Sequence, residues 1–245
     1  MENNFKSEYS WAFDYIRSYF FELEVIAEIG SRDGLDAIDL ADTFKSKFNY
    51  VFEADPDLAK EIELKISNSK KESNFFLYNL ALGSQDKFVK FLAVDLEKYE
   101  NKGVGSLFKI NFNNREISDP DNNRQNVQKT IDVEMKRYSS LDLKTPDLIA
   151  MDVQGAELEV LKGFEEQLHD VKFIILESSI SENYLGGSNF SEIHQYLRNK
   201  FKLIASSRHS EKNYKLFWDN FKYKWSTNKK YQPDLNLFYI NKSLL

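Results

Sequence analysis

Short apolar segments alternate with segments of helical periodicity along most of this chain. This alternation constrains the fold more than any other feature, because a strand, a helix and a parallel strand in succession form a right-handed crossover unit. We therefore expect an α/β fold whose mostly parallel sheet carries helices on both faces. The strands are predicted at Val25–Ile29, Tyr50–Glu53, Phe75–Leu80, Leu148–Asp152, Phe173–Glu177, Phe201–Ala205 and Leu235–Ile240, and the helices at Leu35–Phe48, Pro56–Ser67, Ala156–Lys162 and Ser191–Lys200.

The rest of the chain is predicted to extend this one domain. Aromatic residues at four-residue spacing predict a helix over Ser7–Phe21, in an N-terminal helical extension of residues 1–24. Two strand-like pieces, Lys87–Val94 and Thr130–Lys136, flank an Asn-rich segment over 111–126 that we expect to be a loop. No linker divides the sequence, so a single domain over 1–245 is expected, with residues 206–234 as an insertion or lid before the last strand.

Composition excludes several classes of protein. The chain has no cysteine, which removes disulfides, thiolate metal sites and cysteine nucleophiles. Its net charge of −6 and isoelectric point near 5.3 argue against nucleic acid or an anionic membrane as the main partner. No apolar run reaches the roughly 20 residues of a spanning helix, and "MENNFKSEYS" does not look like a signal peptide. We expect a cytoplasmic protein, and the sequence does not indicate its oligomeric state.

The stretch "VIAEIGSRDGLDAI" predicts a strand, a glycine turn and a helix. In such sheets a ligand lies beyond the carboxyl ends of the strands, and Glu28, Gly30 and Gly34 occupy the first turn there. Glycine permits positive φ and a close ligand, although glycine used only for tight packing explains the turn equally well. Glu53, at the end of the second strand, could accept hydrogen bonds from ribose hydroxyls. The residues therefore outline a nucleoside pocket.

The spacing of this turn bears on which nucleoside it would hold. The pattern is Gly-x-x-x-Gly, without the middle glycine that lets a pyrophosphate approach the helix in dinucleotide sites. Glu28 and Asp33 would also bring negative charge close to a pyrophosphate. S-adenosylmethionine (SAM) has a cationic amino group, a sulfonium and a ribose, and no phosphate. The turn therefore favours SAM over a dinucleotide.

A longer motif, "PDLIAMDVQGAELEVLKGF" over Pro146–Phe164, resembles the signature of FkbM-family methyltransferases, in which a strand ends in D-V-E-G-A-E before a short helix. Other segments agree in order and spacing, so the resemblance covers roughly Val25 to Glu177. These segments are "AEIGSRDG", "FEADP", "YNLALGSQDKFVKF" and "VEMKRYSSLDL". One residue departs from the pattern, since Gln154 stands where the family usually has Glu.

The resemblance implies a SAM-dependent methyltransferase with a Rossmann-like, doubly wound, seven-stranded sheet, acting mostly on hydroxyls of sugars, polysaccharides or related natural products. Carried over to this sequence, it places Glu28 and Gly30 at the methionine part of SAM, with Ser31 and Gly34 in the same turn. It places Glu53 at the ribose, Asn79 and Ala81 at the adenine, and Asp152 beside the transferring methyl group.

Methyl transfer to a hydroxyl requires removal of the acceptor proton by a base or with the help of a metal. Asp152 and Glu157 flank a Gln-Gly-Ala turn and are candidate catalytic carboxylates. Glu177 ends the neighbouring strand, and with Asp152 it could bind a hard cation such as Mg²⁺, a hypothesis that the sequence leaves open. Glu157 has an equally good alternative role, because an acid in the first turn of a helix is stabilised by the exposed N–H groups there.

Two further features bear on catalysis and on the acceptor. His194 is a candidate for the general base, against the alternative of a helix-surface histidine. Residues 208–231 interleave lysines with aromatic residues and could close over a sugar as a lid, or simply pack as an amphipathic insertion. The segment Asn101–Lys109 is a second candidate wall for the acceptor.

The leading hypothesis is therefore a SAM-dependent O-methyltransferase with a glycan or small-molecule acceptor. The alternatives are a non-catalytic SAM-binding or partner-binding module, for which Gln154 is the one hint, and an NAD-dependent oxidoreductase. RNA methylation is a weaker alternative that rests on the basic and aromatic segment.

Overall fold

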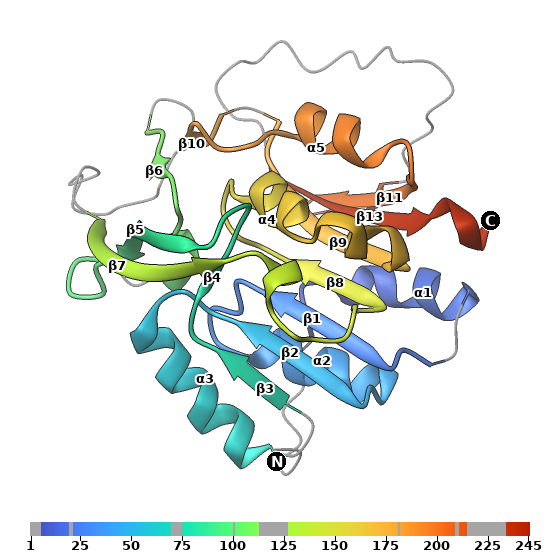
Figure 1. The fold of residues 1–245 in the computed structure, drawn as a ribbon, viewed down its shortest axis with the longest axis horizontal. Helices are drawn as coiled ribbons and strands as arrows, with labels where there is room; N and C mark the ends of the chain where they lie inside the picture. Colours follow the sequence, from blue (N-terminus) through green and yellow to red (C-terminus); the bar gives the residue numbers. More distant parts are fainter. Residues whose placement is uncertain are drawn as a thin grey trace.

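The computed structural model describes residues 6–19, 22–69, 75–99, 101–112, 127–180, 182–208, 211–214 and 234–245. Within these residues the protein is built around one twisted sheet of eight strands (Figure 1). The predicted loop over 111–126 and the predicted lid over 206–234 lie largely outside the described residues. None of the helices in the described ranges is long and apolar enough to span a membrane.

The strand order of the main sheet is β12-β11-β13-β9-β8-β1-β2-β3. The pairs β1 with β2, β2 with β3, β1 with β8 and β8 with β9 are parallel, whereas β13 runs antiparallel to both β9 and β11. The bounds are β1 Val25–Ile29, β2 Phe48–Phe52, β3 Phe75–Tyr78, β8 Leu148–Met151, β9 Phe173–Ser178, β11 Phe201–Arg208, β12 Glu211–Tyr214 and β13 Leu235–Asn241. The predicted seven-stranded, mostly parallel sheet is confirmed, and β12 adds a short edge strand.

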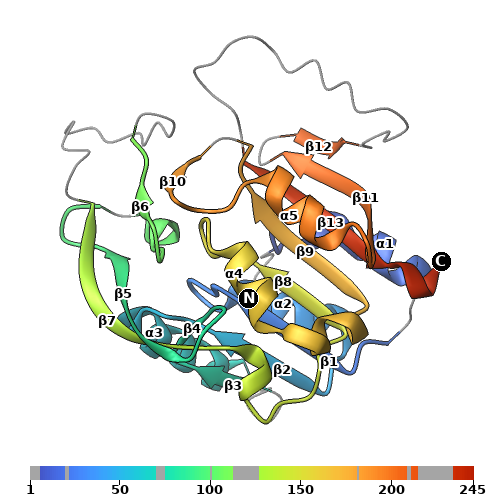
Figure 2. The same ribbon diagram turned by 45° about the horizontal axis from the view of Figure 1, so that its top comes forward.

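Helices cover both faces of this sheet, as Figures 1 and 2 show. One face carries α1 (Phe13–Tyr19), α2 (Leu35–Phe44) and α3 (Pro56–Asn68), and the other carries α4 (Glu157–Gly163) and α5 (Phe190–Leu197). Successive side chains of a strand point to opposite faces. In β8, Leu148 therefore packs with α1 and α2, and Ile149 packs with α4 and α5. The central strands are consequently buried on both sides.

A second group of strands extends from the main sheet, at the left of Figure 1. β5 (Lys87–Val94) pairs antiparallel with β7 (Gln128–Lys136), and β7 also pairs with β4 (Ala81–Leu82). A two-stranded ladder joins β6 (Lys109–Ile110) to β10 (Tyr184–Leu185). Short 3-10 helices complete the described structure. They are η1 Ser10–Ala12, η3 Lys102–Val104, η4 Tyr138–Ser140, η5 Glu165–Asp170 and η6 Lys242–Leu244.

Several boundaries differ from those predicted. The helix predicted over Ser7–Phe21 is a 3-10 turn followed by α1, which ends at Tyr19 within the described residues. The helix predicted to reach Phe48 ends at Phe44, because Phe48 already belongs to β2 and pairs with Val25 of β1. Pairing with a neighbouring strand here overrides the local helical pattern.

Candidate functional site

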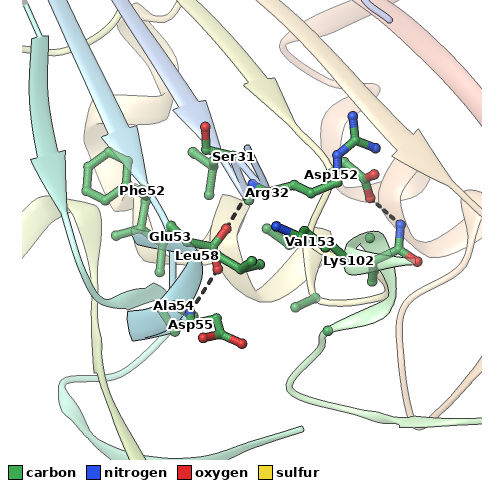
Figure 3. A pocket seen from close by; sticks show the side chains of 18 of the residues that line it. Ser31, Arg32, Phe52, Glu53, Ala54, Asp55, Leu58, Lys102, Asp152 and Val153 are labelled. Atoms are coloured by element: carbon green, nitrogen blue, oxygen red, sulfur yellow. Dashed lines mark hydrogen bonds between the residues drawn. The ribbon is translucent and has the colours of Figure 1, made fainter. Parts of the chain in front are cut away.

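A cleft opens at the carboxyl ends of β1, β2 and β8, with about 840 Å³ of empty space when its solvent-open part is included. Its walls are residues Ile29–Arg32 after β1, Phe52–Asp55 after β2 and Asp152–Gln154 after β8. Figure 3 shows these three turns facing one another. This edge of a doubly wound sheet is where ligands bind.

The turn after β1 requires glycine at position 30. Gly30 has a φ of 82°, and a Cβ atom added there would lie 2.0 Å from the carbonyl oxygen of Asp152. The turns after β1 and β8 are therefore in direct backbone contact. Gly34 has a φ of 76° at the start of α2, and a Cβ there would lie 3.1 Å from Ile62 of α3. Gly34 does not line the cleft, so its structural role is the packing of α2 against α3.

Glu53 is the acid at the end of β2, as predicted, and its carboxylate is buried in the cleft wall. One oxygen accepts the backbone N–H of Arg32 at 2.9 Å and the other accepts that of Asp55 at 2.8 Å (Figure 3). Burial raises the pKa of Glu53 to about 7, although these N–H groups oppose the shift. Asn79 supports this turn from outside the cleft, donating to the carbonyl oxygen of Glu53 at 2.9 Å.

Oε2 of Glu28 and Oγ of Ser31 are buried next to the β1 turn. Burial raises the pKa of Glu28 well above its ordinary value, and the negative charges of Asp36 and other nearby acids add to this rise, whereas the neighbouring hydroxyl of Ser31 opposes it. Ser31 lines the cleft, whereas the predicted contact Glu28 does not. Burial and, after it, the negative charge of Glu28 raise the pKa of Tyr9, which does line the cleft. A cationic ligand group near Glu28 would stabilise the ionised carboxylate.

A hydrogen-bonded network follows β8. The amide nitrogen of Gln154 donates to Asp152 Oδ1 at 2.5 Å and to Glu177 Oε2 at 2.9 Å. Asp152 lines the cleft, as does Gln154. The carboxylates of Asp152 and Glu177 thus share an amide donor, which occupies the place a cation between them would need. No group of three or more His, Cys, Asp or Glu residues suited to a metal ion occurs in the described part of the chain. The residues after β8 therefore do not fit the Mg²⁺ site considered from the sequence.

The two other predicted catalytic residues do not line the cleft. Glu157 is buried at the start of α4, where it accepts the backbone N–H of Gly155 at 3.0 Å, and burial raises its pKa to about 7. His194 lies on α5, with Nδ1 at 3.2 Å from the hydroxyl of Tyr239. Partial burial lowers the pKa of His194. The structure thus favours the helix-terminus role for Glu157, and catalytic roles for both residues stay predictions.

The remaining predicted contact, Ala81, lines the cleft together with its neighbours Leu80 and Leu82. Five of the predicted cofactor residues are thereby brought together in one cleft. They are Gly30, Ser31, Glu53, Ala81 and Asp152.

Sequence reasoning missed part of the cleft wall. Glu8 and Tyr9, from the N-terminal segment, line the cleft, and Arg32 joins them through an ion pair of 3.2 Å with Glu8. These residues belong to no sequence motif. Side chains of α2 hold the N-terminal segment at the cleft, and the sequence alone does not show this contact. Lys102, Gly103, Gly105 and Leu107 contribute a further wall. They belong to the segment Asn101–Lys109, whose role as an acceptor wall stays a prediction.

Comparison with known proteins agrees with this geometry. Residues 27–214 match the model of the methyltransferase FkbM domain. The 2-O-methyltransferase NoeI of Sinorhizobium fredii (strain NBRC 101917 / NGR234) is 29% identical over 190 residues, which cover 74% of this chain and 73% of NoeI.

Two solved structures that this chain matches give TM-scores below 0.5. The crystal structure of methyltransferase FkbM from Methylobacillus flagellatus KT superposes with a TM-score of 0.49 and 12% identity, covering 87% of this chain and 43% of that one. This chain therefore spans less than half of that protein. M. capricolum TrmK, in complex with S-adenosyl-homocysteine, gives a TM-score of 0.47 and 10% identity, covering 94% of this chain and 67% of that one. Because the family model spans residues 27–214, well over half of the sequence, the chain belongs to the FkbM family of methyltransferases.

Proposed function

We propose that this protein is a SAM-dependent O-methyltransferase that methylates a hydroxyl of a sugar, a polysaccharide or a related metabolite. Membership of the FkbM family supports methyl transfer. Similarity to NoeI, a 2-O-methyltransferase, supports a hydroxyl acceptor.

The excess of acidic residues in the cleft is the main observation that favours SAM over a dinucleotide as the cofactor. Among the described residues that line it there are five acids and two bases. The acids are Glu8, Asp36, Glu53, Asp55 and Asp152. Each base already has a carboxylate partner: Arg32 pairs with Glu8, and Lys102 pairs with Glu61. An acidic cleft attracts the ammonium and sulfonium groups of SAM and repels the pyrophosphate of a dinucleotide.

In the proposed complex the ribose hydroxyls donate to Glu53 after β2. The adenine lies near Leu58 and Ala81, which present apolar surface to the cleft. The Gly30 turn would hold the methionine part, and the negative charge of Glu28, which is buried and does not line the cleft, would attract its ammonium group. Asp152 would then be the cleft acid available to the acceptor hydroxyl.

SAM supplies a methyl group that is activated by its bond to a sulfonium, and the sulfur becomes a neutral thioether after the transfer. Transfer forms a bond from the acceptor oxygen to the methyl carbon and breaks the bond from that carbon to sulfur, whose electron pair stays on S-adenosylhomocysteine (SAH). The protein must align the acceptor and remove its proton. We assign the proton to the carboxylate of Asp152, which is both at the cleft and oriented by Gln154.

Isothermal titration calorimetry with SAH and with NAD tests the cofactor. Micromolar binding of SAH and none of NAD is expected. Binding of NAD instead of SAH would indicate an oxidoreductase and refute the proposal.

Catalysis is tested with methyl-labelled SAM and a panel of mono- and oligosaccharides, by following label in the acceptor. Asp152→Asn is expected to transfer the label much more slowly. SAH binding without label transfer to any hydroxylated acceptor would favour a non-catalytic SAM-binding module.

A further inference from the structure

Gln154 has an unusual backbone conformation and a fully engaged side chain. Its φ of 55° lies in the left-handed region, which is uncommon for a residue with a side chain. The residue is only 7% exposed. This conformation aims the carboxamide at the carboxylates of Asp152 and Glu177, which come from the ends of β8 and β9.

The orientation of the carboxamide is fixed by its partners. Tyr184 donates its hydroxyl to Gln154 Oε1 at 2.5 Å, while the amide nitrogen faces the two carboxylates. The reverse orientation would place the amide oxygen against two carboxylates that can only accept. The turn is also held at its backbone, because Ser106 donates to the carbonyl oxygen of Gln154 at 2.7 Å.

A carboxylate at position 154 could not donate to Asp152 and Glu177. Glutamate has nearly the same shape as glutamine but has no N–H group, so three ionised carboxylates would then meet in a buried place. Such a cluster requires either a bound proton or a divalent cation. Glutamine satisfies both acids with one neutral donor group.

We propose that Gln154 is a positioning residue whose carboxamide joins Asp152 and Glu177 into a cation-free pair beside the methyl-donor cleft. The proposal rests on the proposed function for its catalytic meaning, because Asp152 is the acid to which the acceptor proton is assigned. Tyr184 and Ser106 act as supports that keep the amide nitrogen directed at the pair. The reaction accordingly needs no divalent cation, and the isosteric change Gln154→Glu should create a cation site at a pH high enough to keep the three carboxylates ionised.

The first test is titration of Mn²⁺ into the full-length protein saturated with SAH, followed by calorimetry. Saturable binding of SAH itself is checked first, so that failure of the proposed function is seen separately. The wild-type protein should show no saturable Mn²⁺ binding that depends on Asp152. Gln154→Glu should gain a site with a dissociation constant at or below about 1 mM, because three carboxylates supply oxygen ligands.

Two variants locate and control that gain. Gln154→Glu combined with Asp152→Asn removes one of the three carboxylates and should lose the site. Gln85→Glu makes the same change of charge at an exposed glutamine outside the cleft and should gain no Mn²⁺ site. Wild-type binding of Mn²⁺ that Asp152→Asn abolishes would overturn the proposal, as would a folded Gln154→Glu variant that binds none.

A second measurement uses the wild-type protein, in case Gln154→Glu does not fold. In nitrogen-15 NMR spectra of the SAH complex, the Gln154 carboxamide protons should exchange slowly with water, because both N–H groups are hydrogen-bonded and buried. Glu177→Gln should shift this carboxamide resonance and leave that of Gln85 unchanged. Rapid exchange, or broadening of the Gln154 resonance by submillimolar Mn²⁺, would contradict the cation-free pair.

Discussion

The affinity for SAH should rise as the pH increases through the pKa of Glu53, which burial raises to about 7. The negative charge of Asp55 adds to this shift, and the backbone N–H groups of Asp55 and Arg32 oppose it. In the proposed complex Glu53 accepts hydrogen bonds from the ribose, and only the ionised carboxylate accepts them with both oxygens. Binding therefore favours ionisation of Glu53 and lowers its pKa in the complex.

The size of the effect follows from the pKa of the free protein. At about pH 6 roughly one Glu53 side chain in ten is ionised, and at about pH 8 roughly nine in ten are. If the complex holds Glu53 ionised over this range, the dissociation constant of SAH should be about tenfold higher at the lower pH. This factor corresponds to about 1.4 kcal/mol.

Calorimetric titration of SAH at both pH values, at constant ionic strength, measures this difference. Glu53→Gln is the control: it should bind about tenfold or more weakly at the higher pH, through loss of hydrogen bonds to a charged group, and its affinity should be independent of pH. An unchanged wild-type dissociation constant between the two pH values would refute the reasoning. A pH dependence that persists in Glu53→Gln would assign the titration to another acid, with Glu28 the first candidate.

Three other changes have defined outcomes. Gly30→Ala brings a Cβ to 2.0 Å from the Asp152 carbonyl oxygen, so SAH affinity should fall at least tenfold and the melting temperature should fall. A wild-type dissociation constant in calorimetry and a wild-type melting temperature would show that the turn adapts. Asp152→Asn should keep SAH affinity within about twofold and slow transfer by about 10²–10⁴, and full activity would exclude Asp152 as the base. Glu157→Gln should stabilise the protein at about pH 8 but not at about pH 4.5. The pKa of Glu157 is raised to about 7 in the folded protein, so ionisation of this side chain lowers the free energy of unfolding by about 3 kcal/mol. This destabilisation is absent below the pKa of the unfolded chain and complete above the pKa of the folded protein. Equal effects of Glu157→Gln on denaturant unfolding at both pH values would contradict this.

Local signals in the sequence predicted some boundaries well. Asp55 caps α3, its side chain accepting the N–H of Asp57 at 2.9 Å, and Pro56 opens the helix, as predicted. The end of α2 depends instead on distant contacts. Lys45 takes a left-handed φ of 55° after the helix. The N–H of Phe48 then donates to the backbone carbonyl oxygen of Glu24 at 3.0 Å, where β2 begins. Periodicity within one segment cannot show where strand pairing takes residues from a helix.

The same distinction applies to the cleft. Gly30, Glu53 and Asp152 each follow a strand, and the carboxyl ends of parallel strands share one edge of the sheet, so their convergence could be predicted. The substitution at Gln154 was visible in the sequence, but its consequence was not. Its hydrogen bonds reach Glu177 and Tyr184, 23 and 30 residues away along the chain.

The N-terminal segment contributes to the cleft although it lies outside the residues that the family model matches, which start at residue 27. The N–H of Glu8 donates to Asp36 Oδ1 at 3.0 Å, which seats the segment on α2. The side chain of Glu8 then pairs with Arg32, whose own N–H donates to Glu53. Arg32 therefore links the wall formed by Glu8 to the carboxylate proposed to bind ribose. Without Glu8 the guanidinium would keep Asp36 at 4.0 Å but lose its closer partner, and the cleft would lose one of its acids. The acidic character that favours a cationic cofactor thus depends partly on residues outside the family motifs.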